Sequence, residues 1–252
     1  QLAAEMGGAG YLFTGDNDFE VMSSSSLINL NIARLCNKET AGRILFTSSA
    51  CVYNEDNQSD LENYTCKEST VYPAQPDSEY GWEKLFSERL YQSLARNAGL
   101  PVRIARLHNV FGPRGAWCCG REKAPAAICR KVSEAPDGGE VSIWGDGRQI
   151  RSFLYIDECL DGMRTLMKSD CTIPVNIGSD EAISIGDLMT MAIEISGKRL
   201  SVRHEPGPQG VRARCSDNQL VEKELGWRPR QPLRQGMEAT YGWIEQQVKL
   251  TA

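Results

Sequence analysis

The chain has few of the residues from which metal centres and disulfide frameworks are built. Only two histidines occur among its 252 residues, and none of its nine cysteines forms a Cys-x-x-Cys pair. The spacing of a zinc site is therefore absent, and we expect no metal. An odd number of cysteines without a regular pattern indicates reduced thiols, so we expect a reducing compartment, the cytoplasm.

Long apolar runs and an excess of positive charge are also missing. No stretch is long and apolar enough to cross a membrane and no signal peptide can be recognised, so we expect no membrane partner. The net charge of −5 does not favour a nucleic-acid-binding surface. With 41% hydrophobic and 24% charged residues, the composition is that of a soluble globular protein with a sizeable core.

The first half of the sequence alternates strands and helices in the way that is typical of a parallel sheet. Residues 43–47 and 101–107 are short apolar runs that predict strands, and a long helix ending near Gly99 is predicted between them. A polar, serine-rich stretch at 16–26 predicts a loop that leads into another helix at 27–37. Strand, long helix and strand form a βαβ unit, which places the chain in the α/β class.

The long predicted helix carries a tyrosine and a lysine one turn apart. Asp77 or Ser78 is its expected N-cap, which leaves Tyr80 and Lys84 on one face at positions i and i+4. A fixed cation lowers the pKa of a phenol from its usual value of about 10, so such a pair can act as a general base near neutral pH. Alone the pattern is weak, because any long helix can carry it by chance.

Residues after 113 predict smaller α/β elements. A helix is expected to extend to residue 131, and strands are expected at 141–144 and 151–156. Asp157 is the expected N-cap of the next helix. The remaining predicted elements are strands at 175–177 and 200–204 and helices at 185–196, 217–225 and 233–248.

Several motifs occur in the order in which one enzyme family has them. They are Leu2-Ala3-Ala4, Ser48-Ser49-Ala50-Cys51-Val52-Tyr53, Tyr80-x-x-x-Lys84 and Arg106-x-His108-Asn109-Val110-Phe111-Gly112-Pro113. The combination resembles the extended short-chain dehydrogenases/reductases, the nucleotide-sugar epimerase/dehydratase family. The resemblance implies a Rossmann-type parallel sheet with a smaller α/β substrate-binding domain. Residues 1–113 would be a truncated dinucleotide-binding domain and 114–252 mainly the substrate-binding domain, with about 151–178 returning to the sheet.

One feature of this family is missing from the sequence. The Gly-x-x-Gly-x-x-Gly turn, which holds the pyrophosphate of NAD in the family, does not occur. We expect it to lie ahead of Gln1, so that the chain is a fragment of a longer protein. NAD is the cofactor that the resemblance implies, with Tyr80 and Lys84 as its contacts. Smaller departures from the family are Asn54, where proline is common, and Cys118-Cys119, in place of less reactive residues.

Within the family, the sequence is similar to the members that epimerise GDP-mannose at C3 and C5. The similarity lies in residues 6–10, 48–51, 120–127, 144–151 and 207–214. It implies an isomerase of ascorbate biosynthesis that acts through a transient 4-keto intermediate. A ketone at C4 makes the protons at C3 and C5 acidic, because the carbanion becomes an enolate, and nicotinamide can take the hydride and return it.

Five residues receive catalytic roles from the resemblance. Tyr80 would be the base for the C4 hydroxyl, with Lys84 lowering its pKa and Ser49 hydrogen-bonded to the same oxygen. Cys51 and Lys123 would be the acid/base pair at C3 and C5, on opposite faces of the sugar ring. Burial lowers the pKa of a lysine and a nearby cation lowers that of a cysteine, so both could act near neutral pH.

The resemblance also implies a set of substrate-binding residues. Arg151 and Arg214 are expected at the pyrophosphate, because arginine makes forked, charge-assisted bonds to phosphate, and Lys131 is a further anion contact. Without the resemblance, surface ion pairs would be the simpler interpretation of both arginines. The other residues implied at the site are Gly7, Ser49, Ala50, Cys51, Asn109, Glu122, Lys123, Ala124, Gln149 and Ile150. A homodimer through the helices at 27–37 and 79–97 is implied as well.

Two other functions stay open. The first is another nucleotide-sugar enzyme, such as a 4,6-dehydratase, a 4-epimerase or a decarboxylase; Cys51 argues against a dehydratase, which has an acidic residue near this turn. The second is a non-catalytic protein that binds a nucleotide sugar, against which the presence of Tyr80 and Lys84 argues. Side chains expected only to pack or to orient the backbone are His108, His204, Trp117, Trp144 and Trp227.

Overall fold

The computed structural model describes residues 1–59, 61, 64–208 and 210–251. Its central sheet has three parallel strands in the order β1-β3-β8, namely β1 (Ile44–Ser49), β3 (Val102–Leu107) and β8 (Val175–Ile177). Successive side chains of β3 face opposite sides of the sheet, so Ile104 and Ala105 belong to two different cores. The predicted βαβ unit is present, and β1 and β3 end side by side.

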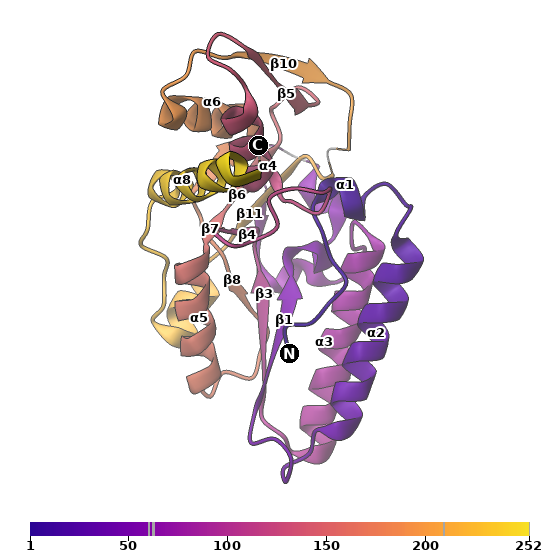
Figure 1. Cartoon of the computed structure of the whole chain (residues 1–252). Helices are drawn as coiled ribbons and strands as arrows, with labels where there is room; N and C mark the ends of the chain where they lie inside the picture. Colours follow the sequence, from indigo (N-terminus) through magenta and orange to yellow (C-terminus); the bar gives the residue numbers. More distant parts are fainter. Residues whose placement is uncertain (60, 62–63, 209, 252) are drawn as a thin grey trace.

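Two long helices, α2 (Asp18–Leu35) and α3 (Glu79–Ala98), pack together along one face of this sheet (Figure 1). The loop predicted at 16–26 is therefore wrong, because α2 already begins at its third residue. Ser25 and Asn29 are fully buried, and Asn29 is hydrogen-bonded across to α3. Small polar side chains allow close helix packing here, so tertiary contacts stabilise a helix that local composition does not predict.

Helix α3 begins and ends as its sequence predicts. The hydroxyl of Ser78 accepts a hydrogen bond from the backbone N–H of Gly81 at 3.3 Å, so Ser78 rather than Asp77 is the N-cap. The helix ends before Gly99, which has a φ of +63°. Glycine adopts this left-handed conformation without strain. The helix thereby places Tyr80 in its first turn, next to the turn that follows β1.

The opposite face of the sheet is covered by α5 (Ile156–Lys168), and α7 (Gln219–Leu225) packs against β8 (Figure 1). Because β8 pairs with β3, the chain returns to the sheet as expected. The strand predicted at 151–156 is instead β6 (Ile150–Ser152) and β7 (Leu154–Tyr155), which belong to different sheets.

The chain bends between these two strands because neighbouring side chains enter different cores. Phe153 packs among the helices of the second half, whereas Leu154 packs beside α5. Helix α5 then begins at Ile156 with Tyr155 as its N-cap residue. The prediction of Asp157 as N-cap is wrong; its carboxylate lies in the first turn, where it still favours the helix dipole.

The second half forms a further layered unit at the top of Figure 1. Three helices pack around a shared core: α4 (Ala124–Glu134), α6 (Ile185–Ser196) and α8 (Leu233–Thr251). The strand pair beside them is β5 (Glu140–Trp144) with β10 (Ser201–Glu205). A four-stranded sheet in the order β2-β11-β6-β9 contains β2 (Thr65–Cys66), β11 (Ala213–Ser216) and β9 (Ala182–Ser184). The domain boundary at residue 113 remains a prediction.

The short elements lie between these layers. They are α1 (Ala9–Leu12), β4 (Val110–Phe111), which pairs with β7, and the 3-10 turns η1 (Ala50–Val52), η2 (Glu55–Gln58) and η3 (Glu68–Val71). Turn η1 matters most for function, because it directly follows the carboxyl end of β1. Side chains at that end of a parallel sheet face the crevice in which ligands bind.

Candidate active site

A pocket of about 460 Å³ lies beyond the carboxyl ends of β1 and β3, bounded on its other side by α4, β5 and β6. Two of the predicted site residues, Lys84 and Ile150, are not among the described residues that line it. All the other predicted site residues line the pocket: Gly7, Ser49, Ala50, Cys51, Tyr80, Asn109, Glu122, Lys123, Ala124, Lys131, Gln149, Arg151 and Arg214. The fold therefore brings side chains that are distant in sequence to one cavity.

One side of the pocket, which we name the sheet wall, consists of Ser49, Ala50, Cys51 and Tyr80. The backbone N–H of Cys51 donates to the hydroxyl of Ser49 at 3.2 Å, which shapes the tight turn η1. This turn packs closely on α3, because a Cβ at Gly81 would lie only 2.2 Å from the carbonyl oxygen of Cys51. Glycine directly after Tyr80 thus lets the thiol and the phenol approach each other.

Lys84 lies behind the sheet wall. Its Nζ is 5.5 Å from the ring centroid of Tyr80 and donates to the carbonyl oxygen of Thr47 at 3.1 Å. Burial raises the pKa of Tyr80, and hydrogen bonding with Ser49 opposes this rise. Burial also lowers the pKa of Lys84. The expectation that Lys84 lowers the pKa of Tyr80 is thus not met, because burial penalises the charged form of both groups.

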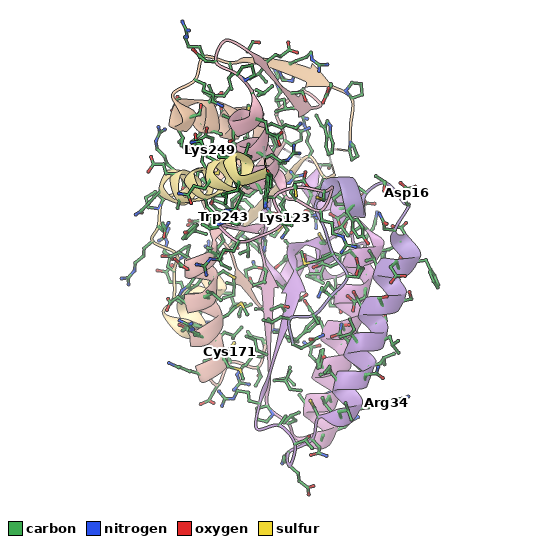
Figure 2. The ribbon with its side chains drawn as sticks, in the orientation of Figure 1. Asp16, Arg34, Lys123, Cys171, Trp243 and Lys249 are labelled. Carbon is green, nitrogen blue, oxygen red and sulfur yellow. The ribbon has the colours of Figure 1, made fainter. Side chains whose placement is uncertain are left out.

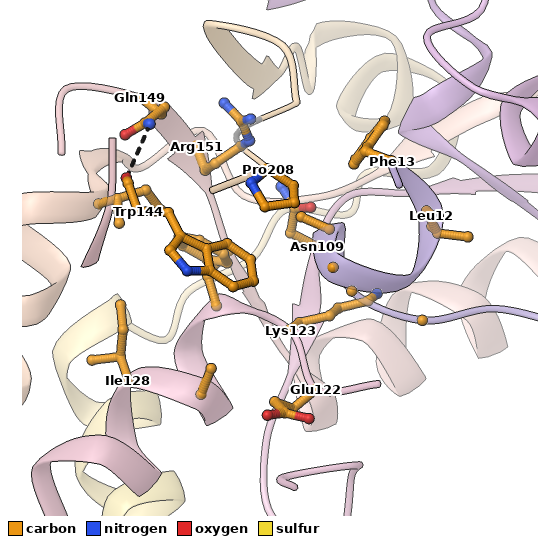
Figure 3. A pocket seen from close by; sticks show the side chains of 18 of the residues that line it. Leu12, Phe13, Asn109, Glu122, Lys123, Ile128, Trp144, Gln149, Arg151 and Pro208 are labelled. Atoms are coloured by element: carbon orange, nitrogen blue, oxygen red, sulfur yellow. Dashed lines mark hydrogen bonds between the residues drawn. The ribbon is translucent and has the colours of Figure 1, made fainter. Parts of the chain in front are cut away.

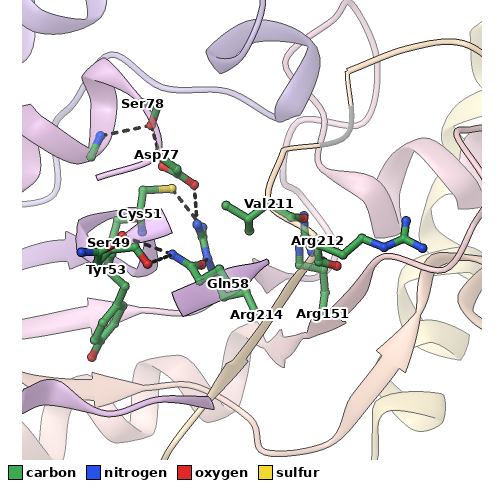
Figure 4. A network of polar contacts seen from close by, with 12 residues as sticks. Ser49, Cys51, Tyr53, Gln58, Asp77, Ser78, Arg151, Val211, Arg212 and Arg214 are labelled. Atoms are coloured by element: carbon green, nitrogen blue, oxygen red, sulfur yellow. Dashed lines mark hydrogen bonds and ion pairs between the residues drawn. The ribbon is translucent and has the colours of Figure 1, made fainter. Parts of the chain in front are cut away.

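Cys51 belongs to a buried polar network with Arg214 and Asp77 (Figure 4). Nη1 of Arg214 donates to Sγ of Cys51 at 3.3 Å, and the same guanidinium is paired with Asp77 and hydrogen-bonded to Gln58. Burial raises the pKa of Cys51, as does the Asp77 carboxylate, whereas Arg214 acts in the opposite direction. Burial therefore outweighs the cation that was expected to lower this pKa, and the thiol keeps its proton at neutral pH.

A second side of the pocket, which we name the loop wall, is formed by residues 120–123, of which Gly120, Glu122 and Lys123 line the cavity. The backbone N–H of Gly8 donates to the carbonyl oxygen of Arg121 at 3.1 Å. A Cβ at Gly8 would lie 2.2 Å from the carbonyl oxygen of Glu122, so only glycine permits this approach. Lys123 is the N-cap residue of α4 and lies in the wall of the pocket (Figure 3).

The electrostatic environment of Lys123 agrees with the prediction. Burial lowers the pKa of its ammonium, and the thiol of Cys51 acts in the opposite direction. The two side chains are therefore near enough to influence each other, although they come from opposite walls of the pocket. Burial favours the neutral form of both groups, a thiol at Cys51 and an amine at Lys123.

Three basic side chains, Arg151, Arg214 and Lys131, also line the pocket. Nη2 of Arg151 donates to the carbonyl oxygen of Val211 at 2.6 Å. Burial and, secondly, the charge of Arg214 lower the pKa of Arg151 to about 10, which leaves it charged at neutral pH. Nζ of Lys131 donates to the carbonyl oxygen of Ser142 at 2.8 Å. Two guanidinium groups and an ammonium suit an anionic ligand such as a pyrophosphate.

Among the pocket residues that were not predicted from the sequence, Trp144 and Asp77 matter most for the site. Trp144 was expected only to pack, but it is 39% exposed and forms part of the pocket wall (Figure 3). A Cβ at Gly207 would lie 2.4 Å from the ring of Trp144. The glycine at position 207 was therefore the sequence signal for a chain segment packed against this ring. Asp77 was considered only as a helix cap. Its partner Arg214 is 137 residues away, and no local pattern links them.

The remaining predictions concern residues outside the pocket. His108 is fully buried, with Nε2 2.9 Å from Oδ1 of Asn176, and burial lowers its pKa to about 3, so it is neutral. Trp117 and Trp227 pack in cores as expected. Among the described residues, no group of three or more histidine, cysteine or acidic side chains is placed to hold a metal ion. In the same part of the chain, no helix has the length and apolarity that a membrane span requires.

Two curated proteins are similar to this chain along nearly its whole length. GDP-mannose 3,5-epimerase of Arabidopsis thaliana is 44% identical over 98% of this chain and 65% of the relative. GDP-mannose 3,5-epimerase 1 of Oryza sativa subsp. indica is 42% identical over 98% of this chain and 64% of the relative. The chain thus spans just under two thirds of the length of these proteins.

Solved structures identify the fold. UDP-glucuronic acid 4-epimerase from Bacillus cereus, in complex with UDP-glucuronic acid and NAD, superposes with a TM-score of 0.82 at 26% identity, covering 98% of this chain and 74% of that one. This confirms the predicted Rossmann-type α/β fold. The model of the NAD dependent epimerase/dehydratase family matches residues 3–178, which is more than half of the chain. The chain therefore belongs to the NAD dependent epimerase/dehydratase family.

Proposed function

We propose that the chain binds NAD and GDP-mannose and takes part in epimerising the hexose at C3 and C5, to GDP-L-galactose or GDP-L-gulose, in the cytoplasm. The observation that carries the proposal is the meeting of the Cys51 thiol, the Lys123 amine and the Tyr80 phenol in one pocket. Relatives named GDP-mannose 3,5-epimerase, at 44% and 42% identity, support this substrate over other nucleotide sugars.

The chemistry at C4 falls to the sheet wall. The hydroxyls of Tyr80 and Ser49 would hold the C4 oxygen between them, and Tyr80 would take its proton and later return it. Hydrogen bonding with Ser49 favours the phenolate that forms, because it opposes the rise in the pKa of Tyr80. A bound NAD would supply the redox chemistry at C4, the removal and return of a hydride.

Lys84 fits the ribose of that cofactor. An ammonium has three N–H donors, and the carbonyl oxygen of Thr47 accepts one of them. It lies buried behind Tyr80 and outside the lining of the pocket, so a ribose hydroxyl that accepts a further hydrogen bond from it would have to approach beside Tyr80. The solved 4-epimerase in complex with UDP-glucuronic acid and NAD supports NAD as the cofactor.

Burial lowers the pKa of Lys123 and raises that of Cys51, which favours the amine as the base and the thiol as the acid. A neutral amine can accept a proton, and a neutral thiol can donate one. We infer that Lys123 removes the proton next to the ketone and that Cys51 delivers one to the opposite face. Because the two groups come from opposite walls, each can reach a different face of the sugar ring.

The part of the pocket that carries the basic side chains would bind the nucleotide diphosphate. Arg151, Arg214 and Lys131 supply the charge for the pyrophosphate. The half-exposed indole of Trp144 offers an aromatic face on which a guanine ring can stack. Arg214 is then shared between the phosphate, Asp77 and the thiol of Cys51.

We also propose a homodimer through α2 and α3. These helices lie on the flank of the molecule that carries no further layer (Figure 1). Their exposed large apolar side chains include Leu27 at 60%, Trp82 at 42% and Phe86 at 47%. Pairing with the same helices of a second copy would cover them in a four-helix bundle. Light scattering should show a dimer that Trp82→Glu converts to a monomer.

Separate titrations with NAD and GDP-mannose, followed by proton NMR of the sugar in deuterated water, test the proposed function. We expect both ligands to bind and the hydrogens at C3 and C5 to exchange with solvent. Inversion of a UDP-sugar at C4 alone would instead support a 4-epimerase. Binding of GDP-mannose without exchange, even with NAD present, would indicate a nucleotide-sugar-binding protein. Tyr80→Phe is the control, since it should bind GDP-mannose without exchanging these hydrogens.

A further inference from the structure

Two adjacent cysteines, Cys118 and Cys119, lie on the loop that leads into the loop wall. Their sulfur atoms are 3.0 Å apart; Cys118 is half-buried and Cys119 is exposed to solvent. Side chains of consecutive residues in an extended chain point to opposite sides. Cys119 has a φ of +70°, in the left-handed region that is uncommon for residues other than glycine, and this turn brings both sulfurs to one side.

This pair is connected to the pocket by a short run of well-defined contacts. The backbone N–H of Gly120 donates to Oε2 of Glu122 at 2.8 Å, and Oε1 of Glu122 is paired with Arg130 of α4 at 3.0 Å. The carbonyl oxygen of Arg121 accepts from Gly8 across the pocket. Lys123 follows directly. A change in the backbone conformation at Cys119 is therefore transmitted along four residues to the amine of Lys123.

The proposed reaction at the sugar does not use these two thiols. A disulfide between neighbours must join Cα atoms about 3.8 Å apart, below the range of roughly 4.4–6.8 Å that disulfides usually have. Such a bond is strained and easily reduced, which is typical of labile, regulatory disulfides. The loop therefore suits a bond that forms and breaks, and a structural cross-link is not expected there.

We propose that Cys118 and Cys119 are a reversible oxidation site, which closes to a disulfide with oxidised glutathione and moves the loop wall away from the pocket. Cys119 attacks first, because it is exposed and because the hydrogen bond between the two sulfurs raises the pKa of Cys118. Its thiolate breaks the disulfide of glutathione, forms a mixed disulfide and releases one glutathione thiolate.

Cys118 completes the exchange. Its thiolate attacks the Cys119 sulfur of the mixed disulfide, the bond between the two protein sulfurs forms, and the second glutathione leaves. The two thiol protons end on two reduced glutathione molecules, and two electrons pass from the protein to the oxidant. Ring closure changes the turn at Cys119, so the contact between Gly120 and Glu122 is lost and Lys123 is displaced. The consequence for the sugar reaction rests on the proposed function.

Glutathione redox buffers of increasing oxidised fraction provide the test, with alkylation, peptide mass mapping and hydrogen exchange as readouts. We expect one peptide in which Cys118 and Cys119 are linked, and faster exchange at Gly8 and residues 120–123. GDP-mannose binding should weaken roughly tenfold, the scale of one lost charged hydrogen bond, and dithiothreitol should restore it. Cys119→Ser should abolish the response. Cys171→Ser, at a half-buried cysteine distant from Lys123 (Figure 2), should leave it unchanged.

Several outcomes would overturn the proposal. They are separate glutathione adducts on the two residues, thiols that stay reduced in the most oxidising buffer, and a disulfide that forms while exchange at Gly8 and residues 120–123 stays the same. If the disulfide forms and exchange increases but GDP-mannose binds neither form, the oxidation site is supported and the proposed function is rejected. Hydrogen exchange thus separates the two ideas.

Discussion

The two walls of the pocket carry related chemistry on very different supports. In the sheet wall, Cys51 lies in a turn between β1 and α3, Tyr80 lies in the first turn of α3, and both are buried. In the loop wall, Lys123 is preceded by a loop from β4 to α4 in which Arg114, Cys119 and Arg121 are exposed. The sheet wall is part of the core, whereas the loop wall packs on the surface of that core.

Because the two walls are supported differently, we expect changes in the sheet wall to affect stability and changes in the loop wall to affect function. Groups in the sheet wall hold one another in place through buried contacts, so changes there should mainly lower the free energy of unfolding. Contacts of the loop wall are few and lie near solvent, so the loop can move without unfolding the protein. Apart from removal of the proposed acid/base groups themselves, we expect changes in the loop wall to act mainly on ligand binding. The following changes, from largest to smallest effect, would break or sharpen this contrast.

Removal of either acid/base group should have the largest effect on turnover. General acid–base groups contribute roughly 10²–10⁴-fold, so Cys51→Ala and Lys123→Ala should each lower kcat by about 10³-fold while GDP-mannose still binds. Proton NMR of the sugar should show that neither variant inverts C3 or C5. Cys36→Ala, at a cysteine outside the pocket, is the control. Full activity of Cys51→Ala would remove the thiol from the mechanism.

Asp77→Asn should destabilise the sheet wall. Its side chain is 2% exposed and that of Arg214 is 6% exposed, so the change leaves a buried guanidinium without its counter-charge. Breaking such a pair costs about 3–5 kcal/mol of unfolding free energy, measurable as a lower denaturant midpoint. The matched control is Asp146→Asn, because the ion pair between Asp146 and Arg212 is exposed. Equal midpoints for the two variants would contradict the role of the buried pair.

Two glycine-to-alanine changes compare the walls directly, because both place a Cβ 2.2 Å from a carbonyl oxygen. Gly81→Ala presses on η1, which has little room to move, and should destabilise the protein by about 2 kcal/mol although alanine favours the helix. Gly8→Ala presses on the loop at Glu122, and should leave the melting temperature nearly unchanged while GDP-mannose binding weakens roughly tenfold. A large loss of stability in Gly8→Ala would show that both walls are equally rigid.

The smallest expected effect is the dependence of the free energy of unfolding on pH. Burial holds the pKa of His108 at about 3, below its unfolded value of about 6.5, so the unfolded state binds a proton that the folded state excludes. Stability is therefore fully present above pH 6.5 and falls by about 1.4 kcal/mol per pH unit below it. Denaturation between pH 5 and 6.5 should show this slope, and His108→Gln should remove it. An unchanged slope in the variant would assign the effect to other groups.

Much of the site could be predicted from sequence because its signals are local. A serine cap and an i, i+4 spacing place Tyr80 and Lys84 on one helix face without knowledge of the fold. Apolar runs predicted the strands that bring the turn at Ser49 to the crevice. The start of α2 could not be predicted in this way, because its serine-rich sequence becomes helical only through packing on α3.

The sequence by itself determined the family and the βαβ order of elements, and it predicted the thiol, amine and phenol of the proposed reaction. Tertiary structure decided their protonation and their neighbours. An ion pair such as Asp77–Arg214 joins residues 137 positions apart, so it exists only after folding. The pKa values of Cys51, Tyr80 and Lys123 likewise depend on how much water the finished pocket excludes, and no local pattern of residues contains that quantity.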